Sequence, residues 1–94
     1  MGTFFSTGST GGGQESTVMS TTPFFAHMGM IYVPLGTRGK KPAPAGAQVG
    51  GSAWGAGTLA SGAEPSEYEL EIAEFQGLGD ESLCRVYFHF LFKF

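Results

Sequence analysis

The sequence predicts an α/β fold with an open parallel sheet, to which this chain contributes two strands and two helices. Two observations support this prediction. Signals for a strand, a glycine loop and a helix are followed along the chain by signals for a strand, a long loop and a helix, an order typical of parallel α/β sheets. Two strands alone would leave the edges and faces of such a sheet bare, so the chain looks like half of a larger domain.

Composition narrows the classes of function. The 94 residues suffice for one small domain, and a net charge of −3 with a pI of about 5.1 argues against nucleic acid as the main partner. A single cysteine, Cys84, excludes an intrachain disulfide and suits a reducing compartment, so a cytoplasmic protein is expected. No apolar run approaches the ~18 residues of a transmembrane segment. Neither His27 nor His89 stands at a metal-ligand spacing from Cys84, so no metal site is expected.

The amino-terminal part of the chain predicts a strand, a glycine-rich loop and a helix. The strand is expected over residues 3–6, and the run 6–13 that follows contains mainly Ser, Thr and Gly. The helix is predicted over residues 14–27. Pro23 lies inside it and lacks a backbone N–H, so it should kink or end the helix. Gly29 is the expected carboxyl-terminal stop.

The middle of the chain predicts a second strand and a long loop. The continuous apolar run 30–35, bounded by glycines, is typical of a parallel strand buried on both faces. The segment 42–63 is rich in Gly, Ala and Pro and has too few branched side chains to form a core. It is therefore expected to be a loop without regular structure, and loops of that length are usually functional or disordered.

The carboxyl-terminal part predicts a second helix followed by a divergent tail. Ser66 and Glu69 form a capping box at the start of the helix, and Gly77 is its expected end. Three apolar residues at spacings of four and three should form its buried face: Tyr68, Ile72 and Phe75. The tail, residues 78–94, is rich in aromatic residues, and its alternation over 86–94 predicts a strand.

Three blocks of sequence carry a family resemblance. Residues 5–17, 27–36, and 50–58 with 65–73 together resemble the WrbA-type NAD(P)H:quinone oxidoreductases, which are FMN flavoproteins of flavodoxin-like fold. The resemblance implies that residues 1–77 are the carboxyl-terminal half of a flavodoxin-like domain. This half would supply the last two strands and helices of a three-layer α/β/α arrangement.

The resemblance also implies a cofactor site. It assigns a histidine near the flavin to His27, and the ring-binding loop to Ser6, Thr7, Gly8, Ser9, Thr10, Gly11 and Gly12. Glycines suit such a loop because they let backbone amides approach a flat ring. Taken alone, the same glycines would favour a tight connection between a strand and a helix, and the resemblance reverses that preference. Trp54 has two open interpretations, as a cover for the flavin or substrate and as a contact between subunits.

The implied activity is the two-electron reduction of a quinone, with NAD(P)H as the electron donor, FMN as the cofactor and a homotetramer as the assembly. The sequence departs from the family because nothing in it matches the loop that cradles the FMN phosphate. The chain alone is therefore not expected to be competent as an enzyme. Two alternatives stay open: a non-catalytic half-domain that associates with a complete subunit, and a non-functional truncated product.

Overall fold

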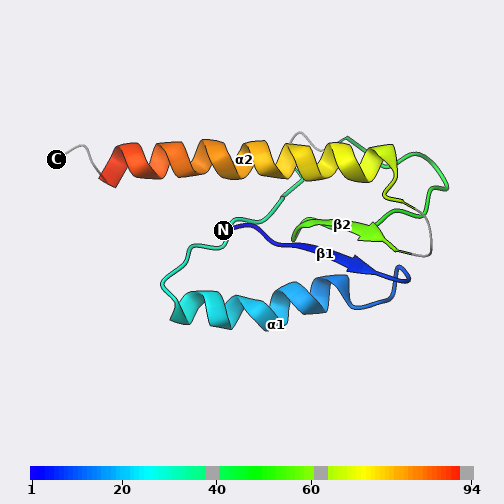
Figure 1. The fold of residues 1–94 in the computed structure, drawn as a ribbon, viewed down its shortest axis with the longest axis horizontal. Helices are drawn as coiled ribbons and strands as arrows, with labels where there is room; N and C mark the ends of the chain where they lie inside the picture. The colour runs from blue at the N-terminus through cyan, green and yellow to red at the C-terminus, as the bar shows by residue number, and fades with distance from the viewer. Residues whose placement is uncertain (38–40, 61–63, 92–94) are drawn as a thin grey trace.

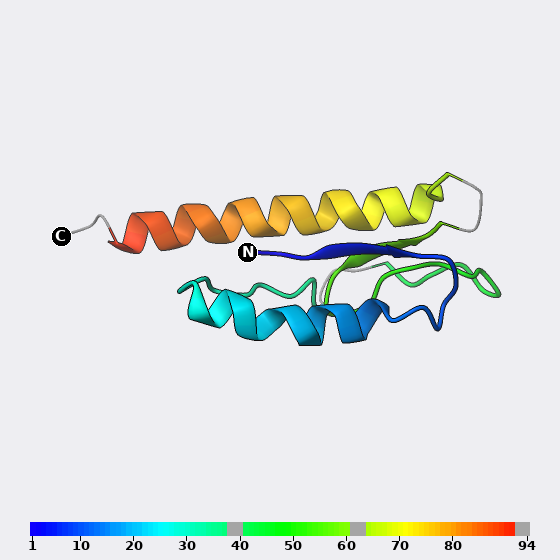
Figure 2. The same cartoon turned by 60° about the horizontal axis from the view of Figure 1, so that its bottom comes forward.

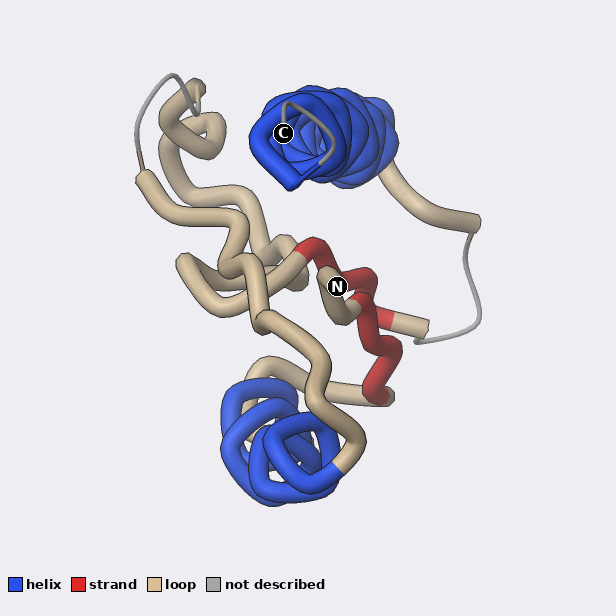
Figure 3. Tube along the Cα trace, turned by 90° about the vertical axis from the view of Figure 1, so that its left-hand side faces the viewer, coloured by secondary structure: helices blue, strands red, loops and turns tan. Residues whose placement is uncertain are grey.

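The fold is a small α/β arrangement in three layers. The computed structural model describes residues 1–37, 41–60 and 64–91, which form β1 (Phe4–Thr7), α1 (Gln14–His27), β2 (Ala56–Leu59) and α2 (Glu67–Leu91) in that order (Figure 1). The two strands are parallel. They lie between α1 on one side and α2 on the other, as Figures 2 and 3 show. The predicted α/β class is confirmed, and the arrangement is consistent with part of a flavodoxin-like fold.

The second strand of the sheet is β2, which lies inside the segment predicted to be a loop. Phe4 pairs with Ala56 and Thr7 with Leu59. The aromatic ring of Phe5 lies close against the backbone of this strand, since a Cβ atom added to Gly57 would stand 2.5 Å from that ring. The expectation of an unstructured loop over 42–63 is thus wrong at 56–59, and residues 61–63 lie outside the described residues.

The apolar run 30–35 is extended but is not a strand, so this prediction is wrong. The ammonium group of Met1 donates to the Ile31 carbonyl at 2.7 Å, and the Val33 N–H donates to the Met1 carbonyl at 2.8 Å. These two bonds make one bridge of the parallel type. The run then leaves toward residue 53, where the Gly36 N–H donates to the Ala53 carbonyl. Of the run, only Leu35 is buried.

The α1 helix spans the 14 predicted residues, and Pro23 does not end it. Four helical residues follow the proline. At the carboxyl end, Gly29 adopts a left-handed φ of 68°, and the Met30 N–H donates to the Phe25 carbonyl at 2.9 Å. This is the Schellman arrangement that favours glycine, so the predicted role of Gly29 as the stop is confirmed.

The α2 helix begins at the predicted capping box but does not end at Gly77. The Ser66 N–H donates to Glu69 Oε2 at 2.8 Å, and the Glu69 N–H donates to Ser66 Oγ at 3.3 Å. The helix continues for 25 residues to Leu91, so the expected strand over 86–94 is also wrong as far as residue 91. Residues 92–94, and the side chains of Cys84 and His89, lie outside the described residues.

The face that α2 buries also differs from the prediction. Phe75 is 38% exposed and Tyr68 is half-buried. Ile72 is buried, as predicted, and its buried neighbours on the helix are Glu69 and Gln76. Two of these three are polar, because their side chains bond the backbone of the sheet rather than packing against apolar groups.

A glycine-to-alanine pair tests the continuous helix. Gly77 has no neighbouring atom within 4 Å of an added Cβ, so Gly77→Ala should raise the free energy of unfolding by about 1 kcal/mol through helix propensity. Gly57→Ala should lower it, because the new methyl group meets the Phe5 ring. Urea unfolding of both variants measures this. A destabilising Gly77→Ala would indicate that the helix ends there.

Candidate functional site

The glycine loop, residues 8–13, joins β1 to α1 in a tight turn. The Gly12 N–H and the Thr7 hydroxyl both donate to the Ser9 carbonyl, at 3.1 and 2.8 Å. A Cβ atom on Gly12 would stand 2.6 Å from the Cβ of Thr7, and Gly13 has a φ of 91°. Glycine is therefore required at both positions, at the first because of a close approach and at the second because of the left-handed backbone.

An open hollow of about 410 Å³ lies beside this loop. Thr10, Gly11 and Gly13 line it from the loop, and Val49, Gly51 and Ser52 line it from the opposite side. The amino terminus of α1 opens onto the hollow, and no side chain caps that terminus. Uncapped N–H groups at a helix start favour electron-rich groups. The hollow therefore offers hydrogen-bond donors to uncharged acceptors such as carbonyl oxygens, whereas Glu15, which also lines it, disfavours an anion.

Side chains from both helices hold the wall opposite the glycine loop. The Gly51 N–H donates to Gln14 Oε1 of α1 at 2.8 Å, and the Gly50 N–H donates to Glu69 Oε1 of α2 at 2.7 Å. Gly51 has a φ of 89°, and a Cβ atom on Gly50 would stand 2.6 Å from the Thr58 nitrogen. The turn at 50–51 is therefore fixed against β2 by two hydrogen bonds and a close backbone approach.

Glu69 is a buried carboxylate surrounded by donors. Besides Gly50, it accepts the Leu59 N–H and the Thr58 hydroxyl, each at 3.1 Å, and it is 7% exposed. Burial alone would raise the pKa of Glu69, but the backbone N–H groups of Gly50, Ser66 and Leu59 outweigh it. Together they lower the pKa to about 2. The side chain is therefore ionised in the folded chain over the physiological pH range.

The structure brings most of the predicted flavin-binding residues together. Ser6 and Thr7 end β1, and Gly8, Ser9, Thr10, Gly11 and Gly12 follow in the glycine loop. A Cβ atom at Gly8 or Gly11 would meet no atom within 4 Å, so the space over these two backbones is open. Their contact with a flavin stays a prediction.

His27 and Trp54 lie apart from the glycine loop. His27 is exposed at the far end of α1, which spans about 20 Å at 1.5 Å per residue. Trp54 is half-buried, with its ring stacked on that of Tyr32 at 6.4 Å between centroids, and its carbonyl accepts the Tyr32 hydroxyl. Trp54 does not line the hollow. The role predicted for each residue stays a prediction.

The sequence reasoning missed the residues that shape the hollow from the other side. Gln14 directly follows the glycine run, and a long polar side chain there was a usable signal. The contribution of Val49, Gly51 and Ser52 depends on a contact between segments more than 30 residues apart in sequence. No local sequence pattern predicts such a contact.

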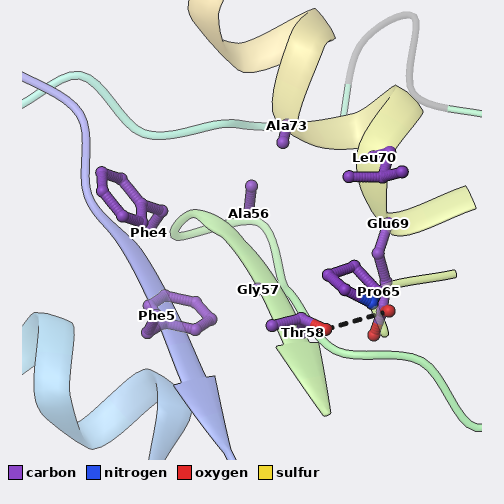
Figure 4. A pocket seen from close by; sticks show the side chains of 9 residues that line it. All are labelled: Phe4, Phe5, Ala56, Gly57, Thr58, Pro65, Glu69, Leu70 and Ala73. Carbon is purple, nitrogen blue, oxygen red and sulfur yellow. Dashed lines mark hydrogen bonds between the residues drawn. The ribbon is translucent and has the colours of Figure 1, made fainter. Parts of the chain in front are cut away.

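A second, apolar hollow of about 150 Å³ lies between the strands and α2 (Figure 4). Phe4 and Phe5 approach it from β1, and Leu70 and Ala73 approach it from α2. The one hydrogen bond drawn there joins the Thr58 hydroxyl to Glu69. None of the predicted flavin-binding residues lines this hollow.

The described part of the chain shows neither a metal-binding cluster nor a transmembrane helix. Within it, no three His, Cys, Asp or Glu side chains are grouped closely enough to hold a metal ion. Its helices also include none that is long and apolar enough to cross a membrane.

The lowered pKa of Glu69 predicts a pH-dependent stability. The folded pKa, about 2, is below the unfolded value of 4.5, so the stabilising effect is complete above pH 4.5 and is lost as the pH falls toward 2. The shift corresponds to about 3 kcal/mol. Unfolding free energies measured from pH 6 to pH 2 should fall less in Glu69→Gln than in the wild type. Glu67→Gln, an exposed control on the same helix, should keep the wild-type slope. Equal slopes in all three proteins would contradict the assignment.

The chain is similar to part of two curated proteins. It is 50% identical over 82 residues to the P25 protein of Schizosaccharomyces pombe and 47% identical over 79 residues to the NAD(P)H quinone oxidoreductase PST2 of Candida albicans. Each match covers 81% of this chain but only 40% and 39% of the two relatives. No family model matches the chain. The resemblance to quinone oxidoreductases is thus confirmed, and the chain spans about two fifths of the length of these relatives.

Proposed function

We propose that this chain provides the flavin-ring loop of an FMN-dependent NAD(P)H:quinone oxidoreductase. One observation carries the proposal: the glycine loop and the uncapped start of α1 open onto one hollow, in a chain 47% identical to a protein named as an NAD(P)H quinone oxidoreductase. The proposed substrate is a quinone, the electron donor NAD(P)H and the compartment the cytoplasm, which suits the single cysteine.

The residues around the hollow fit a flavin ring. A flavin carries carbonyl oxygens and a ring nitrogen that accept hydrogen bonds, and the loop offers a backbone donor at Gly11, which lines the hollow and has open space above it. The Thr10 side chain lines the same hollow. Bound FMN would take hydride from NAD(P)H and pass two electrons to the quinone. The contribution of this chain is to orient the ring and to donate hydrogen bonds to its oxygens.

The distant position of His27 bears on the proposed assembly. About 20 Å separate the two ends of α1, so His27 and the glycine loop of one chain do not meet over one ring. A contact of His27 with the flavin would therefore come from a second copy. This suits the proposed homotetramer, in which Trp54 would lie close to a subunit contact.

Binding of the FMN phosphate falls outside the proposed role of this chain. The glycine loop addresses the ring, and the phosphate would be held by a segment of the longer protein. Charge-assisted hydrogen bonds contribute about 1.5–3 kcal/mol each, so the lack of roughly three costs about 5–9 kcal/mol. At 1.4 kcal/mol for each tenfold change, the affinity of this chain for FMN falls by about three to six orders of magnitude.

A titration of the isolated chain with FMN tests the proposed function. We expect weak binding, with NMR shifts confined to the amides of residues 8–13 and 49–52 and no shifts with inorganic phosphate. Gly12→Val should abolish these shifts, because its side chain would collide with Thr7. Shifts elsewhere would contradict the assignment of the loop. Micromolar binding that is lost in Gly12→Val would show that the loop suffices without a phosphate site.

A second candidate role is that of a non-catalytic half-domain that associates with a complete subunit. The pairing of β1 favours it. Met1 and Thr7 both bond neighbours along one edge of the strand, to residues 31–33 and to Ala60. Backbone groups of successive residues alternate between the two edges, so those of Phe4 and Ser6 face the other edge. Within the described residues no strand borders that edge, and Phe4 is 87% exposed.

Sedimentation measures the consequence of that open edge. Unpaired strand edges with exposed apolar side chains favour association. The purified chain should therefore sediment as a complex, and Phe4→Lys should shift it toward the monomer. A compact wild-type monomer that stays soluble at high concentration would exclude this role.

A further inference from the structure

Gln14 stands where α1, the glycine loop, β2 and the turn at 50–51 meet. Its side chain is 8% exposed and makes three hydrogen bonds. Nε2 donates to Thr7 Oγ1 at 2.8 Å and to the Thr58 carbonyl at 3.1 Å, and Oε1 accepts the Gly51 N–H at 2.8 Å. One amide therefore connects both walls of the hollow to the sheet between them.

The orientation of this amide is fixed by its partners. The Gly51 N–H can only donate and the Thr58 carbonyl can only accept, so oxygen must face the first and nitrogen the second. Thr7 Oγ1 then accepts a hydrogen bond from Nε2. The Thr7 hydroxyl therefore donates its own hydrogen bond to the Ser9 carbonyl, with 2.8 Å between the two oxygens. The Gly12 N–H bonds the same carbonyl at 3.1 Å. The hydrogen bonds thus run in one direction from Gln14 through Thr7 to the turn of the loop.

We propose that Gln14 is the positioning residue of the hollow. Through Thr7 it sets the turn between Ser9 and Gly12, and through Gly51 it sets the opposite wall. The distance between the donors of the loop and the opposite wall therefore depends on one amide. The consequence for flavin affinity rests on the proposed function, whereas the positioning itself does not.

Gln76 provides a matched comparison. It is 7% exposed and also bridges a helix to the sheet, since the Ala56 N–H donates to its Oε1 at 2.6 Å and its Nε2 donates to the Thr3 carbonyl at 3.0 Å. Neither of these bonds reaches the glycine loop or the turn at 50–51. Replacing either glutamine by glutamate keeps its size and removes its donors. Only Gln14→Glu should disturb the hollow.

Hydrogen exchange of single amides in the full chain tests the positioning at neutral pH. In Gln14→Glu the carboxylate repels the Thr58 carbonyl and attracts the Thr7 proton away from Ser9. The amide of Gly12 should therefore exchange at least about tenfold faster than in Gln76→Glu, which reports the general loss of stability, whereas Gly51 keeps a carboxylate acceptor and should not. Equal exchange of Gly12 in the two variants would overturn the proposal.

Thr7→Val separates the action through Thr7 from a general role of Gln14. This substitution should accelerate hydrogen exchange of the Gly12 amide but not of the Gly51 amide. In the double variant with Gln14→Glu, the Gly12 amide should exchange no faster than in either single variant. Thr7→Ser, which keeps the hydroxyl, should restore slow exchange. If Gln14→Glu does not fold, an unchanged exchange rate of the Gly12 amide in Thr7→Val would by itself overturn the proposal.

An FMN titration of the same variants adds a readout of the site. The affinity for FMN, measured from the amide shifts of the loop, should fall about tenfold more in Gln14→Glu than in Gln76→Glu. If FMN shifts other amides of the wild type while the exchange pattern is as expected, the proposed function fails and the positioning role stands. If FMN binds equally well to both variants, Gln14 does not position the ring site.

Discussion

The fold depends on buried polar side chains that bond the backbone between residues 50 and 59. The buried hydrophobic residues of the described part are few: Val18, Leu35, Ala56 and Ile72. Such a core contributes little at about 25 cal/mol per Å² of buried area. Gln14, Glu69 and Gln76 instead accept backbone N–H groups of this segment. A buried donor without a partner costs about 1–3 kcal/mol, so these bonds restrict the segment to one position.

The same constraint determines where the hollow lies. Gln14 from α1 and Glu69 from α2 hold adjacent residues, Gly51 and Gly50, from opposite faces of the sheet. The turn at 50–51 is therefore fixed relative to the glycine loop, even though the two segments are far apart in sequence. Glu69 does not line the hollow, so it holds the turn from the face of the sheet away from it.

Local chemistry in the sequence predicted the parts of the structure that depend on near neighbours. The bounds of α1, its stop at Gly29 and the capping box of Ser66 with Glu69 follow from side chains a few residues apart. The glycine loop is predicted to bind the flavin ring because its glycines and polar residues are contiguous and carry a family resemblance. These elements require no knowledge of distant contacts.

The errors came from contacts between distant segments. β2 was missed because its glycine is required by the Phe5 ring, a contact that no pattern within 56–59 reveals. The end of α2 was placed at Gly77 because glycine often terminates helices, yet an interior glycine costs only about 1 kcal/mol and a long helix tolerates that. The separation of His27 from the glycine loop follows from the length of α1, which places the two at opposite ends of the helix.

The proposal that this chain provides the flavin-ring loop of a quinone oxidoreductase can be tested by enzyme activity in a complete protein. The matched residues of this chain can replace the corresponding 79 residues of the Candida albicans relative, whose remaining length supplies the rest of the fold. We expect this chimera to oxidise NAD(P)H in the presence of a quinone, and we expect Gly12→Val to abolish the reaction. A folded chimera that binds FMN without quinone-dependent oxidation of NAD(P)H, or one that Gly12→Val leaves fully active, would contradict it.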